Sequence, residues 1–521
     1  MNYSKYKDII NSLNWPLLSY FSIISFAVIY MLKNFYYSYQ MGDEGIALVD
    51  AWRIEQGQVP VKDYFSYIQP FSFLITALFF KMFGVNFFAA RLLTLFYGVI
   101  LMILVDQILK YFKSSLYIRS AAIAFLIPYG IFAWPMPSHH WLVGILQLTA
   151  VLSMLYGAGS TKAIFYYFFS GFLMSLACFT QQDQGGYLVI LSLFLVFPFI
   201  DSKRRKNNFL YWAAGGVFCL FLFAIWLLPY VDLMEIINQW FIYPLKFYKS
   251  VKGNENRLFG GWEQIIAMLE HPDIWIDFKI NSLLLEGLLT ILPVLFAFIM
   301  FFAYKNKWVN RFEWGILLAT GLTFWFSAAH RWSITYLIWA APPSLIILMI
   351  ALQKGCNNFS KNIQIMSKIL IFLITLSSIG LTLRNLHIIS GNKTSSFEGR
   401  AGKIYSIRHL EVKKIQTIIN AIEKFVPEDK TLYCTGYLSL FNFITLRMIP
   451  IEHTYYEFTA IFKKDNFNND LISSLEKLDE SYVLLILPLD INNQFHRYLL
   501  SNYQLLWESP WNNGFQLYKR N

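Results

Sequence analysis

Long apolar runs separated by short polar loops dominate the first three quarters of the chain. Several of these runs approach ~20 residues, the length that a helix needs to cross the ~30 Å hydrocarbon layer of a membrane. Inside lipid a spanning segment must satisfy its own backbone hydrogen bonds, as a helix does. The pattern therefore predicts an all-α polytopic membrane protein.

One apolar segment, Phe71–Gly84, is too short to cross comfortably, because a helix of this length spans only about 21 Å. Lys81 also interrupts it. It is either a short spanning helix or a helix that lies along the membrane surface. If it lies flat, the basic loops, such as Lys203–Lys206, all fall on one side of the membrane, as the positive-inside rule requires. We therefore expect about eleven spanning helices, a cytoplasmic N-terminus and interfacial helices in the first outer loop.

This topology, chosen from basic loops alone, gathers the unusual polar residues on the outer face. Charged residues close to the hydrocarbon usually line a substrate or ion path. The convergence predicts a functional site at the outer surface. Its candidates are Asp43-Glu44, His139-His140, Gln182-Asp183, the loop 231–280 and His330-Arg331.

The chain becomes polar and mixed in periodicity near Gly391. Ile407–Phe425 has the pattern of an amphipathic helix, and short strand-like runs follow it. The predicted elements are strands at Thr431–Cys434, Tyr482–Leu487 and Gly514–Tyr518, and a helix near Asn492–Leu500. We expect a membrane domain over 1–388, with outer loops at 34–85 and 231–280, and a small extracytoplasmic α/β domain over 389–521.

Composition agrees with this organisation. Hydrophobic residues make up 56% of the chain and charged residues only 14%, against about 25% charged in soluble domains. The net charge of +11 lies largely in the predicted inner loops, so it does not indicate a nucleic-acid partner. The four cysteines show no metal-like or disulfide-like spacing. The first apolar run lacks a cleavage site, which predicts an uncleaved signal anchor.

Glycosyl transfer from a lipid-borne donor needs a carboxylate that deprotonates a hydroxyl and a cation that stabilises phosphate charge. Asp43 suits the first role, and Glu44 could raise the pKa of Asp43 or bind acceptor. The alternative is a solvated loop whose acids begin a short helix. Arg331 suits the second role through its planar guanidinium, with a snorkelling anchor at a helix end as the alternative.

The other candidates each have a structural alternative. His139 and His140 could bind phosphate, acceptor or metal, although adjacent helical side chains point about 100° apart, which disfavours a shared metal. Gln182 and Asp183 could contact sugar hydroxyls or form a polar helix end. The basic loop 231–280 either touches anionic lipid or covers the site. Arg91 is interpreted as a structural tie to the first outer loop.

Several short motifs occur in a recognisable order. They are Asp43-Glu44, Gly57–Pro60, Asp63-Tyr64, Gln69-Pro70, Phe83-Gly84 and Ala90–Leu92, then Arg331, Tyr336 and Pro342-Pro343. In this order the chain resembles the membrane glycosyltransferases of the GT-C superfamily. It is most similar to the bacterial branch related to protein O-mannosyltransferases and aminoarabinose transferases, glycosyltransferase families 39 and 83.

The resemblance implies a GT-C fold and inverting transfer of a single hexosyl or pentosyl unit from a polyprenyl-phosphate donor such as undecaprenyl phosphate. It assigns Asp43 as the base, with Glu44 beside it. The acceptor would be a glycolipid, a cell-wall polymer or a protein at the outer face of a bacterial plasma membrane. We expect Arg331, His330 and Lys246 to bind the donor phosphate. The expected substrate-binding residues are His139, His140, Gln182, Asp183, Asp63 and Tyr64.

The chain departs from the family pattern at two points. Thr180 and Gln181 stand where related bacterial members often have a Lys, which weakens a phosphate role there. His139-His140 occupy a loop that carries acids in several relatives, so a metal-assisted mechanism is less favoured. No cofactor is expected, and a divalent metal is the alternative.

Two other functions compete with this hypothesis. An oligosaccharide polymerase or ligase with a pyrophosphate-linked donor would carry more outer arginines or a stronger acid cluster. A lipid or solute transporter would show inverted repeats and ionisable groups at mid-membrane. The helix interiors of this chain are nearly uncharged, and its polar groups cluster at one interface. The pattern therefore favours the enzyme.

Overall fold

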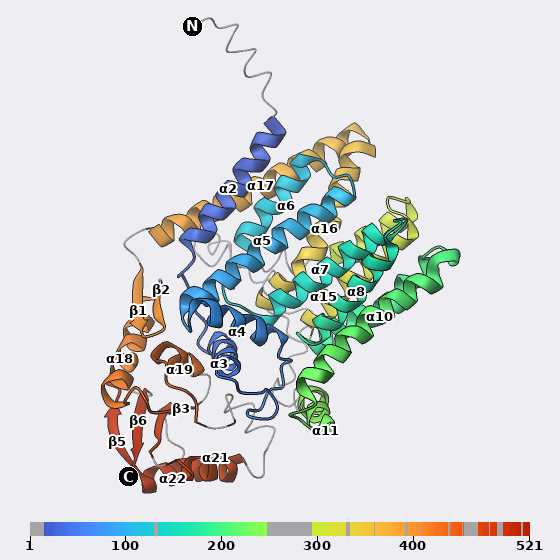
Figure 1. Cartoon of the computed structure of the whole chain (residues 1–521). Helices are drawn as coiled ribbons and strands as arrows, with labels where there is room; N and C mark the ends of the chain where they lie inside the picture. Colours follow the sequence, from blue (N-terminus) through green and yellow to red (C-terminus); the bar gives the residue numbers. More distant parts are fainter. Residues whose placement is uncertain are drawn as a thin grey trace, which may run out of the picture.

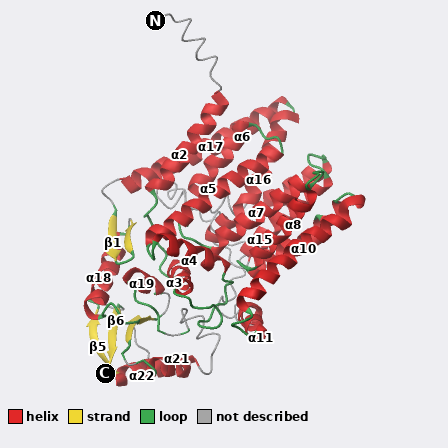
Figure 2. Cartoon of the chain, viewed as in Figure 1, coloured by secondary structure: helices red, strands yellow, loops and turns green. Residues whose placement is uncertain are grey.

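The computed structural model describes residues 15–129, 134–246, 294–329, 334–358, 360–390, 394–406, 408–435, 438–450, 452, 467–478, 480–486, 493–511 and 514–521. Most of the described chain is helical, and the strands gather near the C-terminus (Figures 1 and 2). Antiparallel helices form a bundle at one end of the molecule, and a smaller α/β region lies at the other end (Figure 1).

The bundle contains the long apolar helices. Its helices are α2 (Trp15–Lys33), α5 (Phe87–Tyr111), α6 (Leu116–Tyr129), α7 (His139–Gly157), α8 (Ala163–Cys178), α9 (Gln182–Leu195), α10 (Ser202–Leu227), α15 (Arg311–Ala329), α16 (Ile334–Asn358) and α17 (Lys361–Ser390). Within the described residues, α5, α7, α10 and α17 are long and apolar enough to cross a membrane. Shorter apolar helices, including Val294–Lys305, accompany them. The expectation of a multi-helix membrane protein is confirmed at this level.

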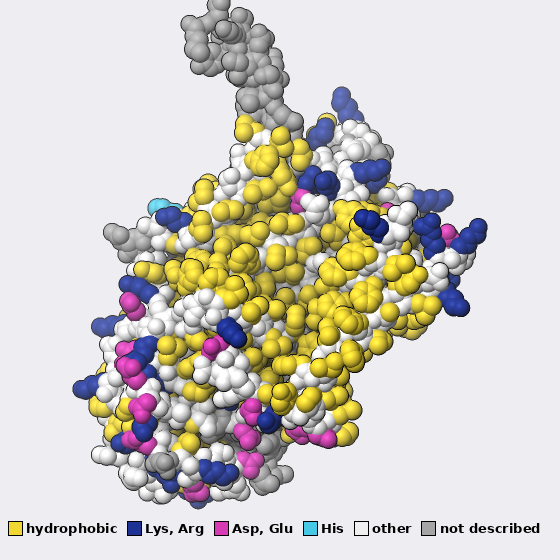
Figure 3. All heavy atoms as spheres, in the orientation of Figure 1, with side chains coloured by type: hydrophobic (Ala, Val, Ile, Leu, Met, Phe, Trp, Pro, Cys, Tyr) yellow, Lys and Arg dark blue, Asp and Glu magenta, His cyan; other side chains and the backbone are white. Residues whose placement is uncertain are grey.

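Charge and hydrophobicity divide the surface into zones. A broad band of hydrophobic side chains covers the helices in Figure 3. Exposed residues such as Phe218 on α10 and Phe372 on α17 show that these helices turn apolar faces outward. Lys and Arg gather at the end of the bundle away from the α/β region, and they are mixed with most of the acidic side chains over that region (Figure 3). The basic end of the bundle agrees with the basic loops that the sequence places on one side.

Helices α3 (Asp43–Glu55) and α4 (Phe71–Phe83) lie where the bundle meets the C-terminal region (Figure 1). Helix α4 buries Phe73, Ala77 and Phe80 and exposes Leu78 and Met82. It ends at Gly84, whose φ of 84° closes the helix in a conformation that glycine adopts without strain. With only 13 residues, α4 is among the shorter apolar helices, as its sequence predicts. After α10 the chain forms the short helix α11 (Leu233–Ile237) and the π-helical turn η3 (Asn238–Ile242).

A four-stranded sheet with the order β3-β4-β6-β5 forms the centre of the C-terminal region. Strand β3 (Leu432–Cys434) is parallel to β4 (Tyr482–Ile486), and β6 (Phe515–Arg520) is antiparallel to both β4 and β5 (Tyr503–Glu508). Helices α18 (His409–Phe425), α19 (Ser439–Thr445), α21 (Phe467–Glu476) and α22 (Gln494–Asn502) accompany it. The expected small α/β region is confirmed.

Some elements of this region were not predicted. The hairpin of β1 (Ser395–Gly399) and β2 (Gly402–Ser406) lacks a clear apolar alternation in sequence. Helix α19 is buried throughout and only 7 residues long, so its periodicity does not distinguish it from a strand. Helix α21 and strand β5 were also missed.

Two large hydrophobic cores, with smaller clusters beside them, organise the described residues. The first lies inside the helix bundle. The second is continuous from α3, α4 and the start of α5 through the β1–β2 hairpin to α19 and the C-terminal sheet. The segment between α2 and α5, predicted from sequence to be the first outer loop and called so below, is therefore packed into the C-terminal region as well as onto the bundle.

Candidate functional site

The acid pair predicted from sequence begins helix α3. This helix starts directly after Gly42, which supplies no side-chain cap, and both acids lie in its first turn. Carboxylates are stabilised there by the positive end of the helix dipole. The two side chains have opposite environments, because Asp43 is exposed and Glu44 is fully buried. Of the pair, Asp43 is the carboxylate that solvent and a substrate can reach.

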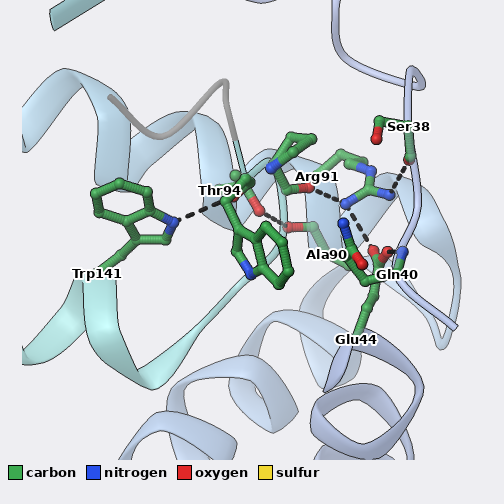
Figure 4. Close-up of polar contacts among 9 residues, drawn as sticks. Ser38, Gln40, Glu44, Ala90, Arg91, Thr94 and Trp141 are labelled. Carbon is green, nitrogen blue, oxygen red and sulfur yellow. Dashed lines mark hydrogen bonds and ion pairs between the residues drawn. The ribbon is translucent and has the colours of Figure 1, made fainter. Parts of the chain in front are cut away.

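Glu44 forms a buried ion pair with Arg91 of α5. Its Oε1 lies 2.6 Å from Arg91 Nη1, and its Oε2 accepts a hydrogen bond from the Gln40 N–H at 3.0 Å (Figure 4). Burial raises the pKa of the Glu44 carboxyl, while the Arg91 guanidinium opposes that rise. Arg91 also donates to the carbonyl oxygens of Ser38, at 2.9 Å, and of Pro135 (Figure 4). The prediction that Arg91 ties down the first outer loop is confirmed.

The loop before α7 connects Arg91 to the two histidines. Ser138 caps α7 by accepting the His140 N–H at 3.2 Å. The His140 ring stacks on Trp339 of α16, with ring centroids 3.6 Å apart and planes inclined by 19°. The His139 ring lies 4.1 Å from that of His140. The start of α7 is thus joined on one side to the acid loop, which is the segment around Asp43 and Glu44 that Arg91 holds. On the other side it contacts the first turns of α16.

Gln182 lies at the first position of α9 and links three segments. Its N–H donates to Gln69 Oε1 at 3.2 Å, just before α4, and its Nε2 donates to the Trp240 carbonyl at 3.2 Å in η3. Asp183 follows it and is half-buried. Behind them, the buried Gln184 Nε2 on α9 donates to Oε1 of the buried Gln147 on α7 at 2.9 Å. These amides fix the end of α9 relative to the first outer loop.

Asp63 and Tyr64, predicted to bind substrate, form a turn in the first outer loop. Asp63 Oδ2 accepts the Val59 N–H at 2.7 Å, and Tyr64 is only 1% exposed. The Arg53 guanidinium lies 5.2 Å from the centroid of the Tyr64 ring. Burial raises the pKa of the Tyr64 hydroxyl. These contacts hold both residues within the fold of the loop, and other protein atoms cover almost all of the Tyr64 side chain.

Of the three predicted phosphate-binding residues, the structure describes Lys246 alone. Lys246 is exposed and is the last residue of its described segment. His330 and Arg331 lie outside the described residues, as does most of the loop 231–280. In the part of the chain that the structure describes, no group of three His, Cys, Asp or Glu side chains is placed to hold a metal ion.

Sequence reasoning missed two buried charges on α3. Asp50 is 0% exposed and Arg53 is 2% exposed. Arg53 donates to Gln58 Oε1 at 3.2 Å and to the Ile449 carbonyl in the C-terminal region at 3.4 Å. The available signal was the presence of charges three residues apart in a helix that is otherwise largely apolar.

Comparison with protein-family models and with curated protein sequences gave no match. Solved structures do match. ArnT from Cupriavidus metallidurans bound to undecaprenyl phosphate superposes with a TM-score of 0.59 at 12% identity, over 98% of each chain. The same protein in its apo state gives a TM-score of 0.60 at 11% identity, over 97% of each chain.

The oligosaccharyltransferase of Archaeoglobus fulgidus is also similar. Its complex with zinc and sulfate gives a TM-score of 0.52 at 12% identity, over 88% of this chain and 68% of that one. Both neighbours are membrane glycosyltransferases of the GT-C class. The chain has the GT-C fold. The resemblance inferred from the order of short motifs is thereby confirmed for the fold, over nearly the full length.

Within this fold, the candidate residues are grouped around the first loop after α2. The first loop after α2 carries an exposed acid, and helices α3 and α4 hold that loop against the bundle. The polar starts of α7 and α9 lie beside the same loop through Arg91 and Gln69. These elements together form the candidate site.

Proposed function

We propose that this protein is a glycosyltransferase that transfers a single sugar, with inversion, from an undecaprenyl-phosphate-type donor to a cell-envelope acceptor. The observation that carries the proposal is the exposed Asp43 carboxylate on a helix turn fixed by the buried Glu44–Arg91 pair. The full-length likeness to a GT-C protein bound to undecaprenyl phosphate supports the choice of donor.

In the proposed reaction, Asp43 accepts the proton of the acceptor hydroxyl as the hydroxyl oxygen bonds to the anomeric carbon of the sugar. The bond between that carbon and the phosphate oxygen breaks, and polyprenyl phosphate leaves. Attack from the face opposite to the leaving group inverts the anomeric configuration. Arg331, His330 and Lys246 are proposed to stabilise the phosphate charge as it develops.

Two further groups of residues complete the proposed site. Gln182 and Asp183 at the start of α9, and His139 and His140 at the start of α7, present polar atoms on the side of the bundle that carries Asp43. Glu44 is proposed to position Asp43, since its own carboxylate is buried. Asp63 and Tyr64 are proposed to act through the shape of the first outer loop.

The proposal includes an orientation in a bacterial plasma membrane. About eleven helices span it, the basic loops face the cytoplasm, and the candidate site and the C-terminal region face outward. The basic end of the bundle supports this orientation (Figure 3). The acceptor is then a glycolipid, a cell-wall polymer or a protein that is presented outside the cell.

The likeness to the archaeal oligosaccharyltransferase supports a second candidate, transfer of an oligosaccharide. We pair it with the pyrophosphate-linked donor that the sequence left as an alternative. The two candidates differ in the donor that they consume. Purified protein in proteoliposomes, supplied with cell-envelope acceptor, should be offered undecaprenyl-phosphate monosaccharides and pyrophosphate-linked oligosaccharides in parallel. Turnover of a monosaccharide donor alone supports the leading proposal, and turnover of an oligosaccharide donor alone supports the second.

The decisive variant is Asp43→Asn, which removes the base and keeps the shape of the side chain. We expect transfer to fall by about 10²–10⁴-fold, the usual contribution of a general base. Asp201→Asn is the matched control, because Asp201 caps α10 in the loop before that helix and Asn caps a helix equally well. Normal transfer by Asp43→Asn would refute the assignment. Absence of transfer from every donor would direct the work to lipid-flipping and transport assays.

A further inference from the structure

Helix α19 of the C-terminal region lies against the helix that carries the acid pair. All seven residues of α19 are buried, although it is one of the shortest helices in the described chain. Its neighbours come from both sides, because it packs on α3 of the first outer loop and on β3 and α18 of its own region. Because no face of α19 is exposed, α19 fills the space between α3 on one side and β3 and α18 on the other.

At Gly45 the backbone of α3 comes directly against the backbone of α19. Gly45 directly follows Glu44, and a Cβ atom at Gly45 would lie 2.2 Å from the Leu440 nitrogen and 2.8 Å from its Cα. No side chain fits between the two helices at this point, so a shift of α19 is transmitted directly to the first turn of α3. That turn also carries Asp43.

Phe443 makes a second contact, between α19 and the helices α4 and α5. Its ring stacks on Phe80 of α4, with centroids 5.5 Å apart, and meets Phe87 of α5 edge-on at 5.2 Å. All three rings are at most 1% exposed. The backbone continues the link, since the Ala401 N–H donates to the Ile444 carbonyl at 3.0 Å and the Phe87 N–H donates to the Ala401 carbonyl at 2.9 Å.

The opposite side of α19 is anchored in the C-terminal region. Asn442 Nδ2 donates to the carbonyl oxygens of Leu432 at 2.6 Å and of Arg447 at 2.9 Å. The Phe441 ring lies 6.3 Å from that of Phe515 on β6. Helix α19 is thus fixed to the sheet on one side and to the acid loop on the other.

We infer that α19 is a positioning element for the acceptor-activating acid, with Leu440 and Phe443 as its positioning residues. The C-terminal region would then be required for turnover through its contact with the first turn of α3. The Arg91–Glu44 pair holds the first turn of α3 from the bundle side, and α19 holds it from the other side. This inference rests on the proposed role of Asp43.

The test compares two buried phenylalanines, one on α19 and one on α22. Phe443→Ala empties the contact with Phe80 and Phe87, whereas Phe495→Ala empties an equally buried contact with Tyr433 inside the C-terminal region. Misplacing a reacting group by about 1 Å can cost about 10²-fold in rate. We expect Phe443→Ala to lower kcat by about 10–100-fold with little change in the KM of the donor, and Phe495→Ala to leave kcat nearly unchanged. Refilling the contact in Phe443→Leu should restore part of kcat.

Thermal unfolding of both variants in nanodiscs separates positioning from a general loss of stability. If the two variants lose kcat to the same extent at equal loss of stability, the inference is wrong. If Phe443→Ala does not fold, Gly45→Ala replaces it, with Gly380→Ala as control because a Cβ at Gly380 meets no atom within 4 Å. Unchanged kcat in Gly45→Ala would likewise overturn the inference.

The parallel Asp43→Asn assay shows which idea has failed. Wild-type transfer that does not depend on Asp43 would overturn the proposed function and remove the basis of this inference. Transfer that depends on Asp43 but is indifferent to Phe443 would overturn only the role of α19.

Discussion

The buried pair of Glu44 and Arg91 makes a sharp prediction about stability. Arg91→Met removes the guanidinium and keeps an unbranched apolar chain in its place. Glu44→Gln removes the charge and keeps an acceptor for the Gln40 N–H. The double variant removes both charges together. Because both residues are at most 2% exposed, solvent screening does not weaken the comparison.

The magnitudes follow from the contacts. Removing one partner of a buried ion pair costs about 3–5 kcal/mol. Arg91→Met also leaves the Ser38 and Pro135 carbonyls without their donor, which adds at least about 1 kcal/mol. Glu44→Gln should likewise cost about 3–5 kcal/mol, because it leaves the buried Arg91 guanidinium without its counter-charge. The double variant should cost about 3–5 kcal/mol, because no unpaired charge remains in it. The coupling free energy is therefore about 2 kcal/mol or more.

The assay is reversible unfolding of the four proteins in mixed micelles, followed at two values of pH. In Arg91→Met the pKa of Glu44 should rise further, since burial raises it and Arg91 opposes the rise. A carboxyl whose folded-state pKa exceeds its unfolded value of about 4.3 binds its proton more tightly when folded, so stability falls as pH rises. The destabilisation by Arg91→Met should therefore be larger at neutral pH than at pH near 5, and adding Glu44→Gln should abolish that dependence.

Additive costs would refute this reasoning. If the double variant loses the sum of the two single losses to within about 0.5 kcal/mol, the two charges do not stabilise each other. A destabilisation by Arg91→Met that does not change with pH would show that Glu44 does not carry the buried charge.

Three further outcomes are expected. His140→Phe should keep the stack on Trp339 and preserve stability, whereas His140→Ala should lose about 0.5–1.5 kcal/mol of aromatic contact in addition to buried area, measured by unfolding. Gln147→Met should cost about 1–3 kcal/mol in the same assay, because its partners on α9 are left buried and unsatisfied. Bonds from Lys519 and then Lys430 lower the pKa of Glu480 to about 2, so the higher melting temperature of wild type over Glu480→Gln should persist above about pH 4.5 and vanish as pH falls toward 2.

The membrane fold was predictable because lipid permits few solutions. Apolar length, loop charge and the shortness of Phe71–Phe83 sufficed to predict a helical membrane protein with α4 outside the set of long helices. The order of short motifs predicted the GT-C fold, which the structure confirms. The hairpin β1–β2 and helix α19 were missed because neither has a periodicity of its own and both are stabilised by partners distant in sequence.

For the candidate site, the sequence singled out the acid pair and did not distinguish the surroundings of its two members. Asp43 and Glu44 are adjacent acids in the chain, and only the structure shows that one is exposed and the other is buried against Arg91. Burial of Tyr64 likewise depends on Arg53 and on the packing of the first outer loop.

The sequence by itself thus determined which segments are apolar enough for a bilayer and which polar residues lie between them, because these properties are local. Tertiary structure decided which acid faces solvent and that α19 of the C-terminal region touches Gly45 of the first outer loop. Those outcomes depend on contacts between residues separated by tens of positions, as for Glu44 and Arg91, or by hundreds, as for Gly45 and Leu440. No local pattern encodes them, since burial and close backbone approach exist only once both partners are in place.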